Sequence, residues 1–111
     1  MCGISGYYFS DDLLKKFKPN LEEACSLLSH RGPDDKGIYY DLNKSLGLSH
    51  NRLSIIDNSL AGHQPMISED ESFILSFNGE IYNFREIKNY LDNNKKIKWK
   101  SKSDTEVLLN L

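Results

Sequence analysis

The start of the chain could supply a nucleophile and a base on one residue. The sequence opens Met1-Cys2-Gly3-Ile4-Ser5-Gly6, and the small side chain of Cys2 favours removal of Met1. The product would carry a thiol and a free α-amine, whose ordinary pKa of about 7.7–8.0 lets it accept a proton near neutral pH. This is the pairing used by N-terminal nucleophiles. The alternative is that Cys2 is simply the second residue before a strand, which we expect over residues 4–9.

Two later stretches carry groups that could bind a substrate. Asn78-Gly79 offers a side-chain amide and a backbone N–H that could stabilise an oxyanion. Asn-Gly after an apolar strand is equally the favoured two-residue hairpin turn. Arg52 lies between polar residues and the short apolar run over residues 53–56. A half-buried arginine implies a carboxylate partner, from the protein or from a ligand, and a structural salt bridge is the commoner case.

The first helix is expected to begin at Pro19-Asn20, after a polar connection over residues 11–18. Asn20 and Glu23 have the spacing of a capping box. Cys25 lies beside the apolar face and is expected to be a buried, inert thiol. The face itself is made by residues at helical spacing: Leu21, Ala24, Leu27 and Leu28.

The remaining pattern predicts mixed α and β structure with a largely antiparallel sheet. Strands over 37–40 and 46–49 form a hairpin, and a third covers 72–77. The lysine-rich stretch 95–102 alternates around Ile97 and Trp99, which predicts an edge strand. Two more helices are expected where capping boxes occur, at Asn83 with Glu86 and at Ser103 with Glu106.

Composition is that of one soluble domain of 111 residues with a net charge of -2, which gives no case for nucleic acid or membrane. Cys2 and Cys25 form neither a disulfide framework nor a C-x-x-C pattern, and the histidines have no metal-like spacing. No signal peptide or run of transmembrane length is present. A cytoplasmic protein is therefore expected.

Read together, six stretches resemble the glutaminase domain of asparagine synthetase, a class II glutamine amidotransferase. They follow the family order, cover nearly the whole chain, and comprise residues 1–6, His30-Arg31-Gly32-Pro33-Asp34-Asp35, residues 51–57, His63-Gln64-Pro65-Met66, Phe77-Asn78-Gly79-Glu80-Ile81-Tyr82-Asn83 and residues 103–106. The glucosamine-6-phosphate synthase branch shares the opening, but the second and fifth stretches are not expected there. The asparagine-synthetase branch is therefore favoured.

The resemblance implies an α+β fold, the four-layer αββα sandwich of antiparallel sheets of N-terminal-nucleophile hydrolases. Residues 1–111 would be a partial, C-terminally truncated amidotransferase domain. The synthetase domain, where ATP and magnesium are expected, would be absent, and no cofactor is expected here. Because the apolar end 107–111 has no glycine cap, we expect Asp104 in a fraying last turn and residues 1–111 alone to be poorly folded and nearly inactive.

The resemblance also implies site roles. Cys2 would attack L-glutamine with its own α-amine as base, and glutamate would form through a thioester. Ammonia would pass to the synthetase domain to amidate a carboxylate. Asn78 and Gly79 would hold the oxyanion. Arg52 would bind the substrate α-carboxylate, with the backbone of Leu53, Ser54, Ile55 and Ile56 lining that side. Glu80 and Asp104 would bind the substrate α-ammonium group. Asn51 stands where the family often has histidine. The alternative is a non-catalytic fragment that acts at most as an interaction module.

Overall fold

A three-stranded antiparallel sheet organises the first half of the molecule. The computed structural model describes residues 1–9 and 13–111. Strands β1 (Gly3–Tyr8) and β2 (Asp35–Asp41) both pair with the central strand β3 (Leu46–Arg52). The predicted hairpin over 37–49 is confirmed, with longer strands than expected. At its turn, the Asp41 carboxylate accepts hydrogen bonds from two backbone N–H groups of the loop.

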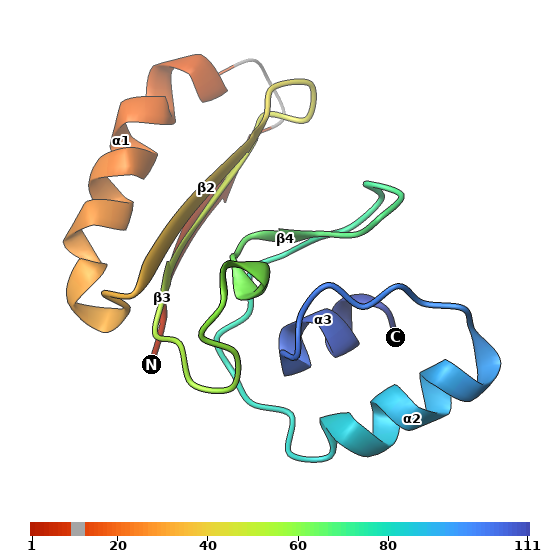
Figure 1. Cartoon of the computed structure of the whole chain (residues 1–111). Helices are drawn as coiled ribbons and strands as arrows, with labels where there is room; N and C mark the ends of the chain where they lie inside the picture. Colours follow the sequence, from red (N-terminus) through yellow and green to blue (C-terminus); the bar gives the residue numbers. More distant parts are fainter. Residues whose placement is uncertain (10–12) are drawn as a thin grey trace.

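Helix α1 (Leu14–Leu27) covers one face of this sheet (Figure 1). Leu21 and Cys25 are 2% and 0% exposed, so the expectation of a buried Cys25 is confirmed. The predicted start at Pro19-Asn20 is wrong, because the helix runs through Pro19. Proline removes one hydrogen bond but has a helix-compatible φ, and packing on the sheet outweighs that loss. The part of the predicted polar connection at residues 11 and 12 lies outside the described residues.

The apolar face of α1 is narrower than predicted. Leu27 was expected on this face but is 71% exposed. It is the last residue of the helix, and the chain turns into a 3₁₀ helix at Ser29–Arg31. Gly3 of β1 lies against this end of α1, where a Cβ would come within 2.8 Å of Leu28 Cβ. The absence of a side chain at residue 3 therefore lets the start of the chain pass close beneath the helix.

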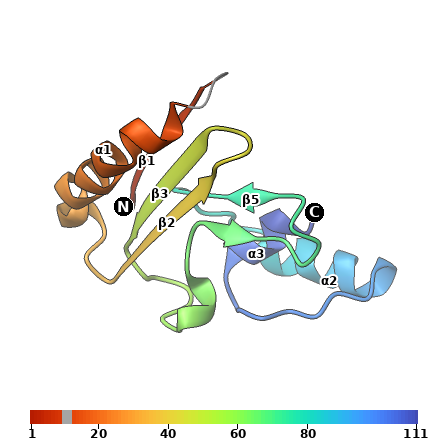
Figure 2. The ribbon, with the colours of Figure 1, turned by 90° about the horizontal axis from the view of Figure 1, so that it is seen from above.

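The second half of the chain lies on the opposite side of the sheet and contacts it locally, at Gly37 and His50 (Figure 1). A 3₁₀ helix at Leu60–Gly62 leads into a two-stranded antiparallel pair, β4 (Met66–Ile67) and β5 (Ile74–Leu75). Helices α2 (Phe84–Asn94) and α3 (Asp104–Leu109) lie beyond this pair, and α3 contacts α2 and both strands (Figures 1 and 2). The protein is thus a small α+β domain with antiparallel sheets, and this part of the predicted fold is confirmed.

Two predicted strands of the second half differ from the structure. Only Ile74 and Leu75 of the predicted strand 72–77 pair with another strand, and residues 95–102 form no strand. The N–H groups of Lys100 and Ser101 donate to the Glu106 carboxylate at 2.8 and 2.6 Å. Backbone groups that bind a side chain in this way cannot also form a sheet ladder.

The two predicted capping boxes have different outcomes. At α3, the Ser103 hydroxyl accepts a hydrogen bond from Glu106 N at 3.3 Å, which confirms that helix start. Asn83 precedes α2 but makes no side-chain cap bond. Asp104 and Val107 of α3 are buried, at 5% and 1% exposed, whereas fraying of this helix and poor folding of residues 1–111 alone stay predictions. Among the described helices, none is long and apolar enough to cross a membrane.

The narrow face of α1 gives a direct stability test. We expect Leu21→Ala to lower the free energy of unfolding by about 2–5 kcal/mol, because it leaves a cavity under the helix. Leu27→Ala makes the same chemical change at an exposed site and should alter it by less than about 0.5 kcal/mol. Urea unfolding of both variants measures the difference. Equal losses would contradict the assignment of the buried face.

Candidate active site

A pocket of about 320 Å³ lies where the N-terminus meets the loop after β3, the segment after β5 and the start of α3. Its volume is within the range of small-molecule sites. The residues around it come from segments far apart in sequence: Met1, Cys2, Arg52, Leu53, Ile55, Ile56, Asp57, Gln64, Phe77, Asn78, Gly79, Glu80, Tyr82, Ser103, Asp104 and Thr105. Every residue predicted for the site is among them except Ser54.

Cys2 is half-buried directly before the first residue of β1, and three contacts fix its position. Its backbone N–H donates to Asn78 Oδ1 at 3.1 Å, and Arg31 Nε donates to its carbonyl oxygen at 3.2 Å. The Leu53 N–H points at Cys2 Sγ, with an N···S distance of 3.3 Å. The sulfur is therefore at the pocket wall with a backbone donor beside it, and its own nitrogen is next to the Asn78 amide.

Asn78-Gly79 does not form the hairpin turn that its sequence also favours. Neither residue has a positive φ, which that turn requires at both central positions, and the chain continues into α2 (Figure 1). Gly79 lies over the Phe77 ring, where a Cβ would be 2.6 Å from Phe77 Cζ. Since Asn78 Oδ1 accepts from Cys2 N, the donor that this side chain can offer to a ligand is Nδ2.

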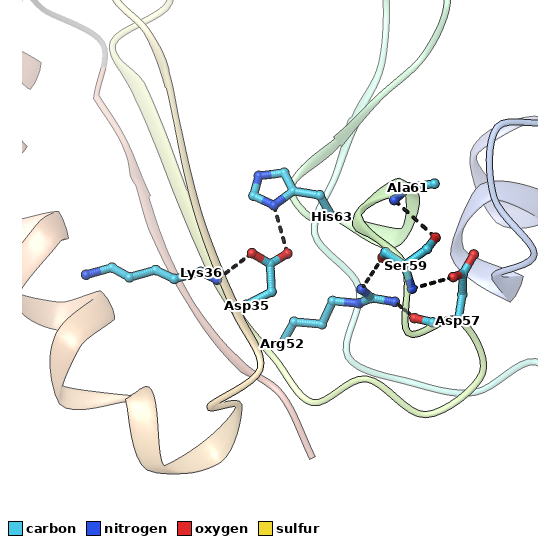
Figure 3. Close-up of polar contacts among 7 residues, drawn as sticks. All are labelled: Asp35, Lys36, Arg52, Asp57, Ser59, Ala61 and His63. Carbon is cyan, nitrogen blue, oxygen red and sulfur yellow. Dashed lines mark hydrogen bonds and ion pairs between the residues drawn. The ribbon is translucent and has the colours of Figure 1, made fainter.

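Arg52 has carbonyl partners in place of the carboxylate that we expected. Its guanidinium donates to Ser59 O at 3.1 Å and to Asp57 O (Figure 3). Among the described residues, no carboxylate forms an ion pair with it. Gly62 lies against the guanidinium, where a Cβ would be 2.5 Å from Arg52 Cζ. Arg52 is 7% exposed, so a buried positive charge borders the pocket. The Asp57 carboxylate interacts with this charge through space, but no hydrogen bond joins the two groups.

The Asp57 carboxylate joins the loop after β3 to the segment before α3. Oδ1 accepts from Ser59 N at 2.8 Å and Oδ2 accepts from Lys102 N at 2.7 Å (Figure 3 draws the first contact). Hydrogen bonds from Ser59 and from the Lys102 N–H lower the pKa of Asp57 to about 2, against the opposing effect of burial. Asp57 is therefore ionised at neutral pH and binds both segments.

Two carboxylates lie on another part of the pocket wall. Asp104 is the first residue of α3, and its Oδ2 accepts from Ile81 N at 2.9 Å. The second oxygen, Oδ1, is the acceptor that remains for a ligand cation. Glu80 borders the pocket and is exposed. The pocket thus has a guanidinium and two carboxylates around a volume suited to a small zwitterion.

Ser54 is the predicted site residue that does not line the pocket. Its N–H donates to Asp34 Oδ2 at 2.7 Å, which holds the loop after β3 against the stretch before β2. Asn51 likewise lies away from the pocket: its Nδ2 donates to Cys25 O at 2.7 Å, on the α1 side of the sheet. Asn51 therefore lies in the core under α1.

Sequence reasoning missed Asp57, Gln64 and Thr105 as pocket residues. Asp57 and Gln64 occur in the stretches that resemble the family, and Thr105 follows Asp104 directly. Their position in or next to those stretches was the available signal. Neither their residue types nor their spacing indicates a chemical role. In the part of the chain that the structure describes, no three His, Cys, Asp or Glu residues gather as a metal site would require.

The comparisons with known proteins place this geometry in a family. The family described as "Glutamine amidotransferase domain" matches residues 1–111, and the chain belongs to this family. The resemblance drawn from the sequence is confirmed.

Similar curated proteins carry the name asparagine synthetase [glutamine-hydrolyzing]. A putative asparagine synthetase 2 of Methanocaldococcus jannaschii is 38% identical over 128 residues, covering 100% of this chain and 24% of the relative. Asparagine synthetase 1 of Arabidopsis thaliana is 37% identical over 111 residues, covering 100% of this chain and 18% of the relative. Asparagine synthetase 1 of Bacillus subtilis is 38% identical, with 98% and 17% covered. The chain therefore spans about a fifth of the length of these relatives.

His50, two residues before Arg52 on β3, gives a pH test of this buried region. It is 0% exposed, its Nδ1 lies 2.9 Å from Ser76 Oγ, and its Nε2 has no hydrogen-bond partner among the described residues. Burial, and then the charge of Arg52, lower the pKa of His50 from 6.5 to about 4. The unfolded chain therefore takes up this proton first, and stability is lost as the pH falls from about 6.5 to about 4.

We expect this loss to be about 3 kcal/mol and to be nearly abolished in His50→Gln. The free energy of unfolding, measured by urea at several pH values, reports it. His30→Gln is the matched control at an exposed histidine and should keep the unsubstituted pH dependence. A pH dependence that survives in His50→Gln would show that another group causes it.

Proposed function

We propose that this chain is a glutaminase that hydrolyses L-glutamine through a thioester on Cys2. The observation that carries the proposal is the one pocket bordered by the Cys2 thiol, the Asn78 amide, the Arg52 guanidinium and the carboxylates of Glu80 and Asp104. A free α-amino acid presents an anion, a cation and a side chain. The pocket offers a group suited to each.

Arg52 binds the substrate α-carboxylate in this proposal. Its two carbonyl contacts occupy two of five N–H donors, and the others are left for a ligand. The Asp104 carboxylate binds the α-ammonium group through Oδ1, and Glu80 adds negative charge at the mouth. The backbone of residues 53–56 borders the bound substrate, with Ser54 as the residue whose N–H fixes the loop.

The chemical step begins once Met1 is removed and the Cys2 nitrogen becomes an amine. The amine takes the thiol proton, the sulfur attacks the side-chain amide carbon, and the carbonyl oxygen becomes an oxyanion held by Asn78 Nδ2 and Gly79 N–H. When the carbon–nitrogen bond breaks, the proton returns to the leaving group as ammonia. Water then attacks the thioester, the amine again carries the proton, and glutamate leaves with the thiol restored.

We further propose that residues 1–111 belong to the four-layer αββα architecture of N-terminal-nucleophile hydrolases. The order α1, three-stranded sheet, β4–β5 pair and helices α2 and α3 supports this (Figure 1). The ammonia would serve a synthetase part outside these residues, which amidates a carboxylate as the names of the relatives indicate. Two free thiols, Cys2 and Cys25, fit a cytoplasmic location.

Substitution of the nucleophile tests the proposed reaction. Met1-free protein is expected to release glutamate and ammonia from glutamine, at a low rate if residues 1–111 are expressed alone, and Cys2→Ala should reduce this rate to background. Cys25→Ala is the matched control, because that thiol lies on the buried face of α1, and its rate should be unchanged. Protein that retains Met1, identified by intact mass, should be inactive because its Cys2 nitrogen is an amide. Turnover by Cys2→Ala would refute the mechanism, and a folded but inactive Met1-free protein would indicate an interaction module.

Substitution of Arg52 tests substrate binding. Arg52→Lys keeps the charge but loses the planar fork, so we expect KM for glutamine to rise about 10- to 100-fold with a smaller change in kcat. Arg85→Lys, on the exposed surface of α2, is the control and should leave both constants unchanged. Thermal unfolding establishes that each variant is folded. A normal KM in folded Arg52→Lys would restrict Arg52 to holding residues 57–59.

A further inference from the structure

Gln64 has no role in the proposed chemistry, yet its side chain connects two walls of the pocket. It is the only glutamine in the chain and is 5% exposed. Its Oε1 accepts from Phe77 N at 2.7 Å, and its Nε2 donates to Thr105 Oγ1 at 3.4 Å. Phe77 directly precedes Asn78 and Thr105 directly follows Asp104. The amide therefore joins the segment of the proposed oxyanion site to the helix that carries the proposed ammonium site.

The backbone of Gln64 is itself held against the three-stranded sheet. Its carbonyl group lies over Gly37 of β2, where a Cβ would be 2.8 Å from the carbonyl carbon. A side chain at residue 37 would therefore displace residue 64. Because Gly37 sits directly opposite His50 in the strand register, Gln64 packs against the part of the sheet that leads to Arg52 two residues later.

We propose that Gln64 is a positioning residue that sets the separation between Asn78 and Asp104 to the length of the bound amino acid. This inference rests on the proposed glutaminase function. A side-chain amide offers an acceptor and a donor in one rigid plane, so one residue satisfies the Phe77 N–H and orients the Thr105 hydroxyl. Loss of the acceptor would leave a half-buried N–H unpaired, and the segment carrying Asn78 would shift.

The two contacts of Gln64 make different predictions for catalysis. Asn78 acts on the transition state, so loosening its segment should lower kcat. Asp104 binds the part of the substrate that does not react, so loosening α3 should mainly raise KM. A residue that only stabilised the fold would change the midpoint of thermal unfolding without separating these two constants.

The experiment compares Gln64→Met, which removes both contacts at similar volume, with Thr105→Val, which removes only the contact to α3. For Gln64→Met we expect kcat to fall and KM to rise, each about 3- to 10-fold. For Thr105→Val we expect the same rise in KM with kcat within about twofold, and Thr105→Ser should restore KM. The double variant should have the KM of Gln64→Met, because both substitutions break the same contact between Gln64 and Thr105.

Amide hydrogen-exchange rates report on each Gln64 contact without requiring catalytic activity. The Phe77 N–H should exchange faster in Gln64→Met only. The Ile81 N–H, which donates to Asp104 Oδ2, should exchange faster in both Gln64→Met and Thr105→Val. Asn94→Leu, which removes an exposed side-chain amide from α2, is the control for each measurement. The inference is confirmed if these two amides respond separately in the stated variants.

The outcomes distinguish this inference from the proposed function. Lack of glutamine hydrolysis by the unsubstituted Met1-free protein would overturn the proposed function, whereas the exchange rates would still decide whether Gln64 joins the two walls. In an active protein, unchanged Phe77 and Ile81 exchange in Gln64→Met would overturn the inference. So would a lowered thermal midpoint with kcat and KM both within about twofold of the unsubstituted values.

Discussion

The second half of this chain depends on hydrogen bonds from backbone N–H groups to buried side-chain oxygens. Strands β4 and β5 have two residues each, so sheet pairing satisfies little of the backbone around them. The N–H groups of the neighbouring segments donate to four buried acceptors: Asp57, Gln64, Asp104 and Glu106. A buried unpaired N–H costs about 1–3 kcal/mol, so each acceptor strongly favours one arrangement of the two segments it joins.

These acceptors also explain why the pocket is made from distant segments. Asp57 bonds to a residue 45 positions later, Asp104 to one 23 positions earlier, and Gln64 to one 13 positions later. All three side chains also line the pocket. The contacts that assemble the second half therefore build the pocket wall at the same time, and a polar lining is stable because its oxygens already have protein donors.

The same interactions separate what the sequence could predict from what it could not. The β2–β3 hairpin and the start of α3 depend on neighbours in sequence, and both were predicted. The stretch 95–102 has the alternating pattern of a strand, but the N–H groups of three of its residues donate to the Glu106 and Asp57 carboxylates. The hydrophobic periodicity of the sequence gives no sign of these contacts. The start of α1 was missed because the packing of the helix on the sheet outweighs the local signal at Pro19. Gln64 is a residue type that often has no special role, and nothing in the sequence around it indicates one. Only the positions of Phe77 and Thr105 in the fold show that it joins two segments.

The position of Arg52 shows how a fold can leave a buried charge available to a ligand. Two backbone carbonyls hold its guanidinium, and Gly62 leaves room for it. Carbonyl dipoles orient a cation but do not neutralise it. The adjacent Asp57 carboxylate accepts from the Ser59 and Lys102 N–H groups and interacts with Arg52 through space without a hydrogen bond to it. Because a buried charge gains most from an anion in direct contact, the proposed substrate carboxylate would supply the direct partner that Arg52 does not have among the described residues.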